Sequence, residues 1–263
     1  MVLVNLVPRQ RGRCRTAARP PVRWHSLHPV RYVLYALLAL AGSVFAAPRF
    51  EDTMAQRMLA CSACHGQEGR AGPDGYYPRI AGKPTGYLYN QLLNFRDGRR
   101  HYGLMARLLD PLSDAYLLEI ARHFASLDLP YPMPQAATAS PATLARGEAL
   151  ALRGDPATRV PACVGCHGAA LTGVLPDTPG LLGLPRDYLL AQLGAWRTGQ
   201  RQAHAPDCMA DIAMRLAPED LAAVTSWLAA RALPANARPA ASLPEPPSIA
   251  CGSAARPAGA PRR

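Results

Sequence analysis

The chain contains the pentapeptide Cys-x-x-Cys-His twice, at residues 61–65 and 163–167. In this motif the two thiols add to the vinyl groups of a porphyrin, and the histidine binds the iron as an axial ligand. The spacing keeps all three side chains within about one turn of helix. The sequence therefore predicts two covalently bound haem c groups. The predicted attachment residues are Cys61, Cys64, Cys163 and Cys166, and the predicted proximal iron ligands are His65 and His167.

A structural zinc site is one alternative use of two Cys-x-x-Cys pairs, because together they supply four thiolates. Such a site has no use for the histidine that follows each pair. The pairs also lie roughly one hundred residues apart, which is well beyond ordinary zinc-knuckle spacing. A thioredoxin-type dithiol is a second alternative. Haem attachment is the interpretation that uses all three residues of both motifs.

The N-terminal segment has the organisation of a secretory signal. Residues 1–31 hold seven arginines and no acidic residue, and an apolar run follows at residues 32–47. Residues 44–46 read Val-Phe-Ala, a small-x-small cleavage pattern. The apolar run is shorter than the roughly 20 residues of a membrane-spanning helix. We predict a signal peptide at residues 1–46 and export to the periplasm. An uncleaved N-terminal anchor, or a start downstream of Met1, stays open.

The charge of the chain depends largely on this segment. The formal net charge is +11, and it falls to +4 once the seven N-terminal arginines are removed. A basic isoelectric point can indicate nucleic-acid binding, but most of the excess positive charge lies in the predicted signal. We therefore expect no nucleic-acid partner, and a membrane contact that is peripheral or made through the anchor.

Two cysteines remain after haem attachment is accounted for. Cys14 lies in the predicted signal, which leaves Cys208 and Cys251. Two unassigned thiols in an oxidising compartment suggest a disulfide, although sequence cannot show that their Cα atoms come within bonding range. If the bond forms, it ties the C-terminal tail beside Met209 and shields the edge of that haem.

An internal duplication at a period of roughly one hundred residues defines the predicted domains. Residues 62–66 match 164–168, residues 78–84 match 179–185, and residues 95–98 match 196–199. We predict one cytochrome c domain at residues 47–129 and a second at 141–233. A proline-rich linker spans residues 130–140. The tail, residues 234–263, is rich in Pro and Ala and is predicted to be disordered unless Cys251 pins it down.

Each domain is predicted to contain three main helices around its haem, which makes the fold all-α. The first leads into the haem motif, the second begins near Pro84 or Pro185, and the third spans about 113–127 or 218–232. Apolar residues recur at helical spacing in these segments, and Ser113 is a candidate N-cap. No segment alternates convincingly as a strand. So few helices make a thin core, and a covalent haem would supply the missing apolar interior.

A methionine lies about 40 residues after each motif histidine, at matching positions of the two repeats. These are Met105 and Met209, and each precedes the last helix by the same interval. A thioether as the sixth iron ligand raises the reduction potential. The register therefore predicts Met105 and Met209 as distal ligands. Core packing is the ordinary role of a single methionine.

Other residues near these positions have competing interpretations. His101 and His204 could give bis-histidine ligation, but their offsets from the methionines differ. Met214 has no equivalent in the first repeat, so we expect it to lie in the core. Pro78 and Pro179 match between repeats, and a nearby carbonyl could accept the N–H of the proximal histidine.

The chain resembles dihaem cytochromes of the cytochrome c4 family. The resemblance rests on Cys-x-x-Cys-His-Gly, on Tyr-Pro-x-x-Ala-Gly at 77–82, on the Tyr, Gln-Leu, Phe and Gly-x-Arg pattern of 87–100, and on the methionine before a Leu-Ser helix. It implies a tandem pair of class I cytochrome c domains in the periplasm. It also implies His/Met ligation by His65 with Met105 and by His167 with Met209. Lys83 departs from the family pattern, which usually has glutamine there.

The resemblance implies an electron carrier without catalytic residues, serving redox partners such as a terminal oxidase, a cytochrome bc-type complex or a dehydrogenase. Two alternatives stay open. The chain could be an electron-transfer subunit tethered to a membrane dehydrogenase or oxidase. It could also be a dihaem peroxidase, which would need one iron with an open coordination position.

Overall fold

The computed structural model describes residues 31–35, 51–72 and 75–254. Residues 31–35 form a short, fully exposed helical stretch. The rest of the predicted signal peptide, residues 1–46, lies outside the described residues. The helices and loops from Glu51 onward belong to one structural unit. Within the described part of the chain, no helix has both the length and the apolar character needed to cross a membrane.

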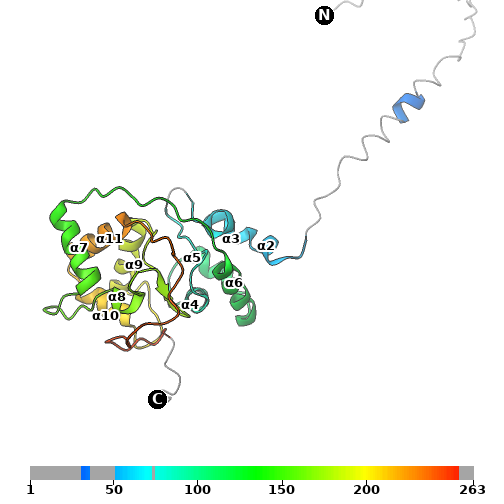
Figure 1. The fold of residues 1–263 in the computed structure, drawn as a ribbon. Helices are drawn as coiled ribbons and strands as arrows, with labels where there is room; N and C mark the ends of the chain where they lie inside the picture. The colour runs from blue at the N-terminus through cyan, green and yellow to red at the C-terminus, as the bar shows by residue number, and fades with distance from the viewer. Residues whose placement is uncertain (1–30, 36–50, 73–74, 255–263) are drawn as a thin grey trace, which may run out of the picture. The chain divides into compact units, whose positions relative to one another are not determined.

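The N-terminal half of this unit is helical (Figure 1). Its elements are α2 (Met54–Arg57), α3 (Leu59–His65), the 3-10 turn η1 (Gln67–Gly69), α4 (Thr85–Arg96), α5 (Gly103–Leu109) and α6 (Asp114–Ser126). Thr53 and Ser113 cap α2 and α6, because each side-chain oxygen accepts from a backbone N–H three residues on, at 3.2 and 3.3 Å. Helices α4 and α6 pack together.

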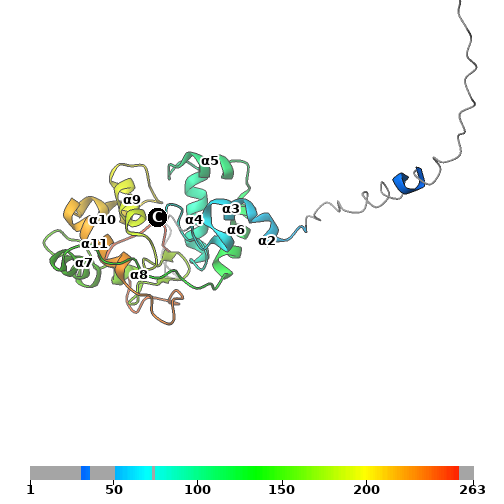
Figure 2. The same cartoon turned by 90° about the horizontal axis from the view of Figure 1, so that it is seen from above.

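The C-terminal half repeats this arrangement, as the view from above shows (Figure 2). Its elements are α7 (Pro141–Arg153), α8 (Val164–His167), β1 (Gly173–Val174), β2 (Thr178–Pro179), α9 (Arg186–Arg197), α10 (Cys208–Arg215) and α11 (Pro218–Ala230). Helix α11 packs against α7 and α9. The two strands form a small antiparallel pair that the sequence did not predict. The prediction of an all-α fold is confirmed in its main features.

Buried apolar side chains form two separate clusters, one in each half. Leu117, Ala121 and Phe124 of α6 belong to the first cluster. Leu150 of α7 and Val224 of α11 belong to the second. Each half therefore has its own core, which supports the predicted division at the linker. The domain boundaries themselves stay a prediction.

A reciprocal hydrogen-bond network joins the two halves. Arg100 donates to Oε1 of Gln91 in its own half at 2.9 Å and to Oε1 of Gln192 in the other half at 2.7 Å. Arg201 donates to the same two oxygens, at 3.0 and 2.9 Å. Arg100 and Arg201 occupy matching positions of the sequence repeat. The internal duplication thus reappears as a paired contact between the halves.

Backbone bonds reinforce this junction. The N–H of His101 donates to the carbonyl of Gln200 at 2.8 Å, and that of Gln202 donates to the carbonyl of Arg99 at 2.6 Å. These bonds run between the segments that follow α4 and α9. The two halves are therefore joined by main-chain as well as side-chain hydrogen bonds.

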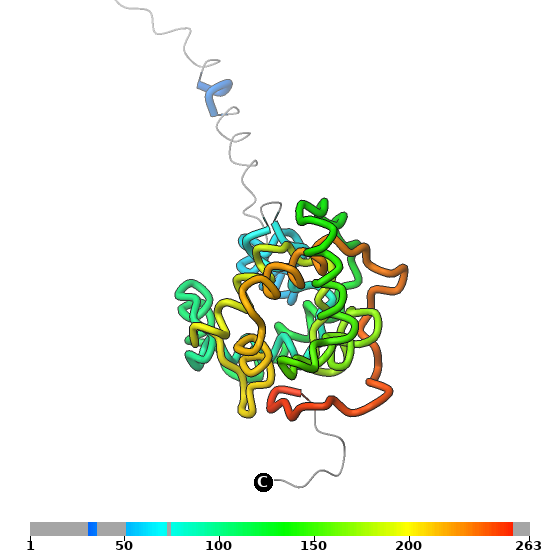
Figure 3. The backbone as a smooth tube through the Cα atoms, turned by 90° about the vertical axis from the view of Figure 1, so that its left-hand side faces the viewer, coloured from blue at the N-terminus to red at the C-terminus, as the bar shows by residue number. Residues whose placement is uncertain are grey.

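The composition of the C-terminal tail predicts disorder unless Cys251 pins it down, and the structure meets that condition. A disulfide joins Cys208 to Cys251, with Cα atoms 4.9 Å apart. Residues 234–254 follow the surface of the C-terminal half, drawn orange to red in Figure 3. Ala240 exchanges backbone hydrogen bonds with the segment containing β1. These cross-links attach residues 234–254 to the C-terminal half, although their composition cannot form an apolar core.

Two glycines test the packing of the C-terminal half. A methyl group on Gly147 of α7 would overlap the backbone carbonyl of Ala223 and come within 2.8 Å of Trp227 Cβ. Gly194 of α9 has open space around the same position. We expect Gly147→Ala to lower the free energy of unfolding by about 1–3 kcal/mol through overpacking. Gly194→Ala should raise it by up to about 1 kcal/mol, since alanine favours helix.

Chemical denaturation of the haem-loaded variants checks both values. Equal effects of the two substitutions would contradict the close contact between α7 and α11.

Candidate haem sites

The first motif lies on α3 and ends at a buried histidine. His65 is 8% exposed, and its Nδ1–H donates to the carbonyl of Pro78 at 2.8 Å. A carbonyl can only accept, so the proton is on Nδ1 and the lone pair is on Nε2. Burial also lowers the pKa of His65, which favours the neutral ring. The structure therefore presents the form of histidine that binds a metal.

The second motif repeats this geometry around α8. His167 is 7% exposed, and its Nδ1–H donates to the carbonyl of Pro179 at 2.7 Å. Burial lowers the pKa of His167 as well. The predicted role of the matching prolines is confirmed, and in each half the acceptor is the carbonyl of the proline itself. A bond of this kind fixes the ring orientation and increases the basicity of the ligating nitrogen.

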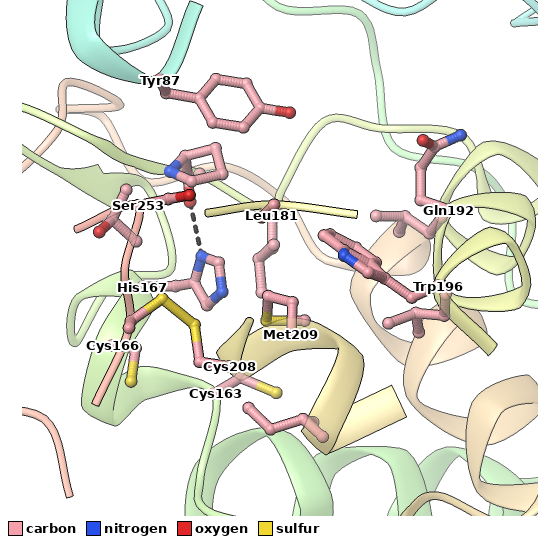
Figure 4. Close-up of a pocket in the computed structure, with 18 of the residues that line it drawn as sticks. Tyr87, Cys163, Cys166, His167, Leu181, Gln192, Trp196, Cys208, Met209 and Ser253 are labelled. Atoms are coloured by element: carbon pink, nitrogen blue, oxygen red, sulfur yellow. Dashed lines mark hydrogen bonds between the residues drawn. A yellow bond between two sulfur atoms is a disulfide. The ribbon is translucent and has the colours of Figure 1, made fainter. Parts of the chain in front are cut away.

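A cavity in the C-terminal half brings the predicted site residues together (Figure 4). Cys163, Cys166, His167 and Met209 all line it. Its walls are largely apolar and come from α7, α9, α10 and α11. Burial raises the pKa of Cys163 to about 11, so the free thiol is protonated there. The cavity has the apolar character that a porphyrin requires.

The methionines are better placed than the rival histidines. Met209 lines the cavity with His167, whereas His204 is absent from the lining and its backbone N–H donates to Ser253 Oγ. In the N-terminal half, Met105 packs against the same core cluster as Cys61. His101 is exposed. The role of either methionine as an iron ligand stays a proposal.

One expectation about methionine is wrong. Met214 was predicted to lie in the core, but it is 61% exposed on α10. The reason is the orientation of the helix: Ala213 is buried and Ile212 packs against the core, which turns the next position outward.

The cavity also collects polar donors that lack an anionic partner. Lys83, from the N-terminal half, and Arg201 both line it and are 6% and 5% exposed. Neither forms an ion pair with any carboxylate of the described residues. Trp196 Nε1 is buried without a hydrogen-bond partner among these residues. Burial lowers the pKa of Lys83 to about 8.

These three donors, none of which has a carboxylate partner among the described residues, fit the group that the motif predicts. Buried cations are normally paired, because an isolated charge in an apolar site is costly. A haem c carries two propionate carboxylates beside its apolar ring. Lys83, Arg201 and Trp196 would hold such carboxylates, while the apolar walls would enclose the ring.

The sequence only partly revealed this set of donors. Lys83 departs from the family pattern, and Gln91 and Arg100 belong to the pattern of residues 87–100, but the sequence indicates no role for them. The recurrence of Gly-x-Arg at 98–100 and 199–201 was the one signal that could have pointed to the shared interface.

The zinc interpretation has no support in the structure. Across residues 31–35, 51–72 and 75–254, no three His, Cys, Asp or Glu side chains gather as a metal site. The two Cys-x-x-Cys pairs therefore do not converge on one ion.

Comparison with known proteins also indicates a haem protein. The chain is 38% identical to a thiosulfate dehydrogenase electron acceptor of Thiomonas intermedia, over 78% of this chain and 93% of that protein. It is 35% identical to cytochrome c4 of Pseudomonas aeruginosa, over 74% of this chain and 96% of that protein. No family model matches the chain.

The chain belongs to the cytochrome c4 family.

Solved structures show the fold of this family. Cytochrome c4 of Pseudomonas stutzeri matches with a TM-score of 0.58 and 31% identity, covering 66% of this chain and 94% of that one. Thiosulfate dehydrogenase TsdBA of Marichromatium purpuratum matches with a TM-score of 0.59 and 32% identity, covering 67% of this chain and 37% of that one. The fold is thus that of class I cytochromes c. The protein is a dihaem electron-transfer cytochrome with two covalent haem c groups, rather than an enzyme.

The position of Lys83 leads to a prediction about the second haem. A buried cation beside His167 disfavours the more positive ferric iron, so it raises the reduction potential. We expect Lys83→Gln to lower the potential of the second haem and leave that of the first nearly unchanged. Lys83→Arg, which keeps the charge, is the matched control.

Spectroelectrochemical titration resolves the two potentials. An equal shift at both haems, or the same shift in the arginine variant, would contradict the role of the lysine charge.

Proposed function

We propose that this cytochrome is an exported, periplasmic electron carrier in which both irons have histidine and methionine ligands. His65 pairs with Met105, and His167 pairs with Met209. The observation that carries the proposal is the shared cavity of His167 and Met209. The matching sequence register extends it to the first half.

Export is supported by two independent features. The N-terminal sequence has the basic and apolar regions of a secretory signal. The disulfide between Cys208 and Cys251 is typical of a protein that folds in an oxidising compartment. Haem c attachment needs reduced thiols first, and the remaining pair of cysteines is free to form the bond.

The residues of each site suit electron transfer. When bound, haem c supplies an iron that gains and loses one electron. The Pro78 and Pro179 carbonyls hold the protons on Nδ1 of His65 and His167, which leaves each Nε2 as the ligand atom. Met105 and Met209 would each supply a thioether to such an iron, which would raise its potential and leave no open coordination position for a substrate. This arrangement favours the carrier over the peroxidase alternative.

The junction between the halves supports exchange within the molecule. Arg100 and Arg201 each bond to both Gln91 and Gln192, and Arg201 also lines the second cavity. Because this network joins the two halves directly, it favours electron exchange between the two haem sites.

Replacement of the distal ligands tests this proposal. Met105→His and Met209→His should each retain haem but lower the potential of that site alone, because imidazole stabilises ferric iron more than thioether does. Met105→Ala should open a coordination position that binds carbon monoxide quickly. The wild type should bind carbon monoxide slowly at both haems.

Potentials and carbon monoxide binding rates provide the measurement. If one wild-type haem binds carbon monoxide rapidly and the protein also turns over peroxide, the carrier function is wrong and the peroxidase alternative is favoured.

A second candidate names the electron donor. The relative from Thiomonas intermedia, matched over 93% of its length, is a thiosulfate dehydrogenase electron acceptor. A thiosulfate dehydrogenase also contains a region that matches this chain in structure. We propose that this cytochrome receives electrons from a thiosulfate dehydrogenase and passes them to a respiratory partner such as a terminal oxidase.

Reconstitution with purified components tests the donor. Oxidised cytochrome mixed with thiosulfate and a thiosulfate dehydrogenase should develop the absorbance of reduced haem c. Thiosulfate alone should give no such change. If the thiosulfate dehydrogenase fails to reduce the cytochrome while a cytochrome bc-type complex reduces it, the proposed carrier function is kept. The proposal of a thiosulfate dehydrogenase as electron donor is then wrong.

A further inference from the structure

The tail that follows the second core forms a strap along the C-terminal half. We call residues 238–254 the strap. Its first attachment is an ion pair between Arg238 and Asp128. Its second is a pair of backbone bonds: Leu175 N–H donates to the carbonyl of Ala240 at 2.8 Å, and Ala240 N–H donates to that of Gly173 at 2.9 Å. The near end is therefore fixed to the segment after the second haem motif.

The far end of the strap is fixed beside α10. Cys251 forms the disulfide with Cys208, the first residue of that helix. Gly252 N–H donates to the carbonyl of Pro206 at 2.9 Å. Ser253 accepts twice, from the backbone N–H of His204 at 3.2 Å and from Asn90 Nδ2 at 3.3 Å. The last of these contacts comes from the N-terminal half.

Between its two ends the strap forms a wall of the second haem cavity. Pro247, Ile249, Cys251 and Ser253 all line that cavity. Figure 4 shows the disulfide and Ser253 beside His167 and Met209. Cys208 directly precedes Met209, so the covalent bond holds the start of the helix that presents the methionine.

Comparison of the two repeats shows what the strap covers. Leu104 precedes Met105 as Cys208 precedes Met209. Leu104 is 59% exposed, and Leu108, one turn later, is 45% exposed. At the position of the second half that matches Leu104, Cys208 is bonded to the strap. The strap therefore covers, in the second half, a position whose counterpart in the first half is exposed.

We propose that the strap is a specificity-determining cover for the second haem. It keeps Met209 in the cavity and closes that face to small ligands and partner proteins, so that partners exchange electrons at the first haem. The proposal rests on the proposed His/Met carrier function. Because the strap is held at both ends, loss of the disulfide loosens it and loss of the whole segment uncovers the cavity.

Two variants and one control test the cover. The first is Cys208→Ser with Cys251→Ser. The second is Cys208→Ser in a chain that ends at Arg238. The control is Ser248→Ala, an exposed strap position. We expect carbon monoxide to bind the second haem about tenfold faster in the truncated chain, because local opening of α10 becomes easier. The disulfide variant should lie between this chain and the control.

Hydrogen exchange gives a readout that does not depend on haem activity. Backbone amides of Cys208–Arg215 should lose protection in the truncated chain, while those of Gly103–Leu109 should keep it. Opening the disulfide of the wild-type protein with a phosphine reductant repeats the test without a sequence change, should a variant fail to accumulate.

Three outcomes overturn different parts of the proposal. Slow carbon monoxide binding and full protection of α10 in the truncated chain would show that the strap is not a cover. Equal acceleration at both haems would show a general loss of stability instead. Fast binding at both haems of the wild type would remove the His/Met carrier function, whatever the strap does.

Discussion

The bond from each motif histidine to a proline carbonyl is the contact on which the haem sites depend. The motif places a histidine next to its cysteines, but sequence adjacency fixes neither the tautomer nor the plane of the ring. The carbonyls of Pro78 and Pro179 do both, at 2.8 and 2.7 Å. Pro78 lies in a loop after the first motif, and Pro179 is the last residue of β2 after the second. Both segments must therefore be ordered before the ligand is oriented.

The junction between the halves depends on a buried arginine rather than on a histidine hydrogen bond. Arg201 is almost fully buried and lacks a carboxylate partner among the residues of the described chain. Such burial costs free energy unless other contacts offset it. Two glutamine oxygens accept its N–H groups, and the guanidinium lies 3.8 Å from the centre of the Trp196 ring. Haem carboxylates at this point would offset the remaining cost of burying Arg201, so we expect cofactor binding and docking of the halves to stabilise each other.

The sequence predicted those parts of the structure that follow from local pattern. Helices α4, α6, α9 and α11 lie close to their predicted ranges because apolar spacing, caps and initiating prolines all agree. Helices α5 and α10 were not predicted, since each is short. Asp207 caps α10 by accepting from the N–H of Ala210 at 3.1 Å, whereas α5 has no side-chain cap. The haem motifs and the register of Met209 with His167 were clear because a duplication displays each of them twice.

Features that depend on long-range contacts were harder to predict. Counting cysteines suggested the bond between Cys208 and Cys251, but only the structure shows that the two Cα atoms come within bonding range. Two further features need the assembled structure: the N–H of Trp196, which has no partner among the described residues, and the position of Lys83 in a cavity of the other half. Contacts between side chains of the two halves produce no periodic pattern in the sequence, so they cannot be predicted from it.

Lys83 makes the two haem sites of this internally duplicated protein different from each other. Its counterpart in the second repeat is Leu184, which is buried to a similar degree, 7% against 6% exposed. Gene duplication alone would produce two equivalent haem sites, neither of which would be reduced before the other. A single buried ammonium group, contributed by one half to the cavity of the other, removes that equivalence. We therefore expect the two sites to differ in reduction potential, which would give electron transfer between them a preferred direction.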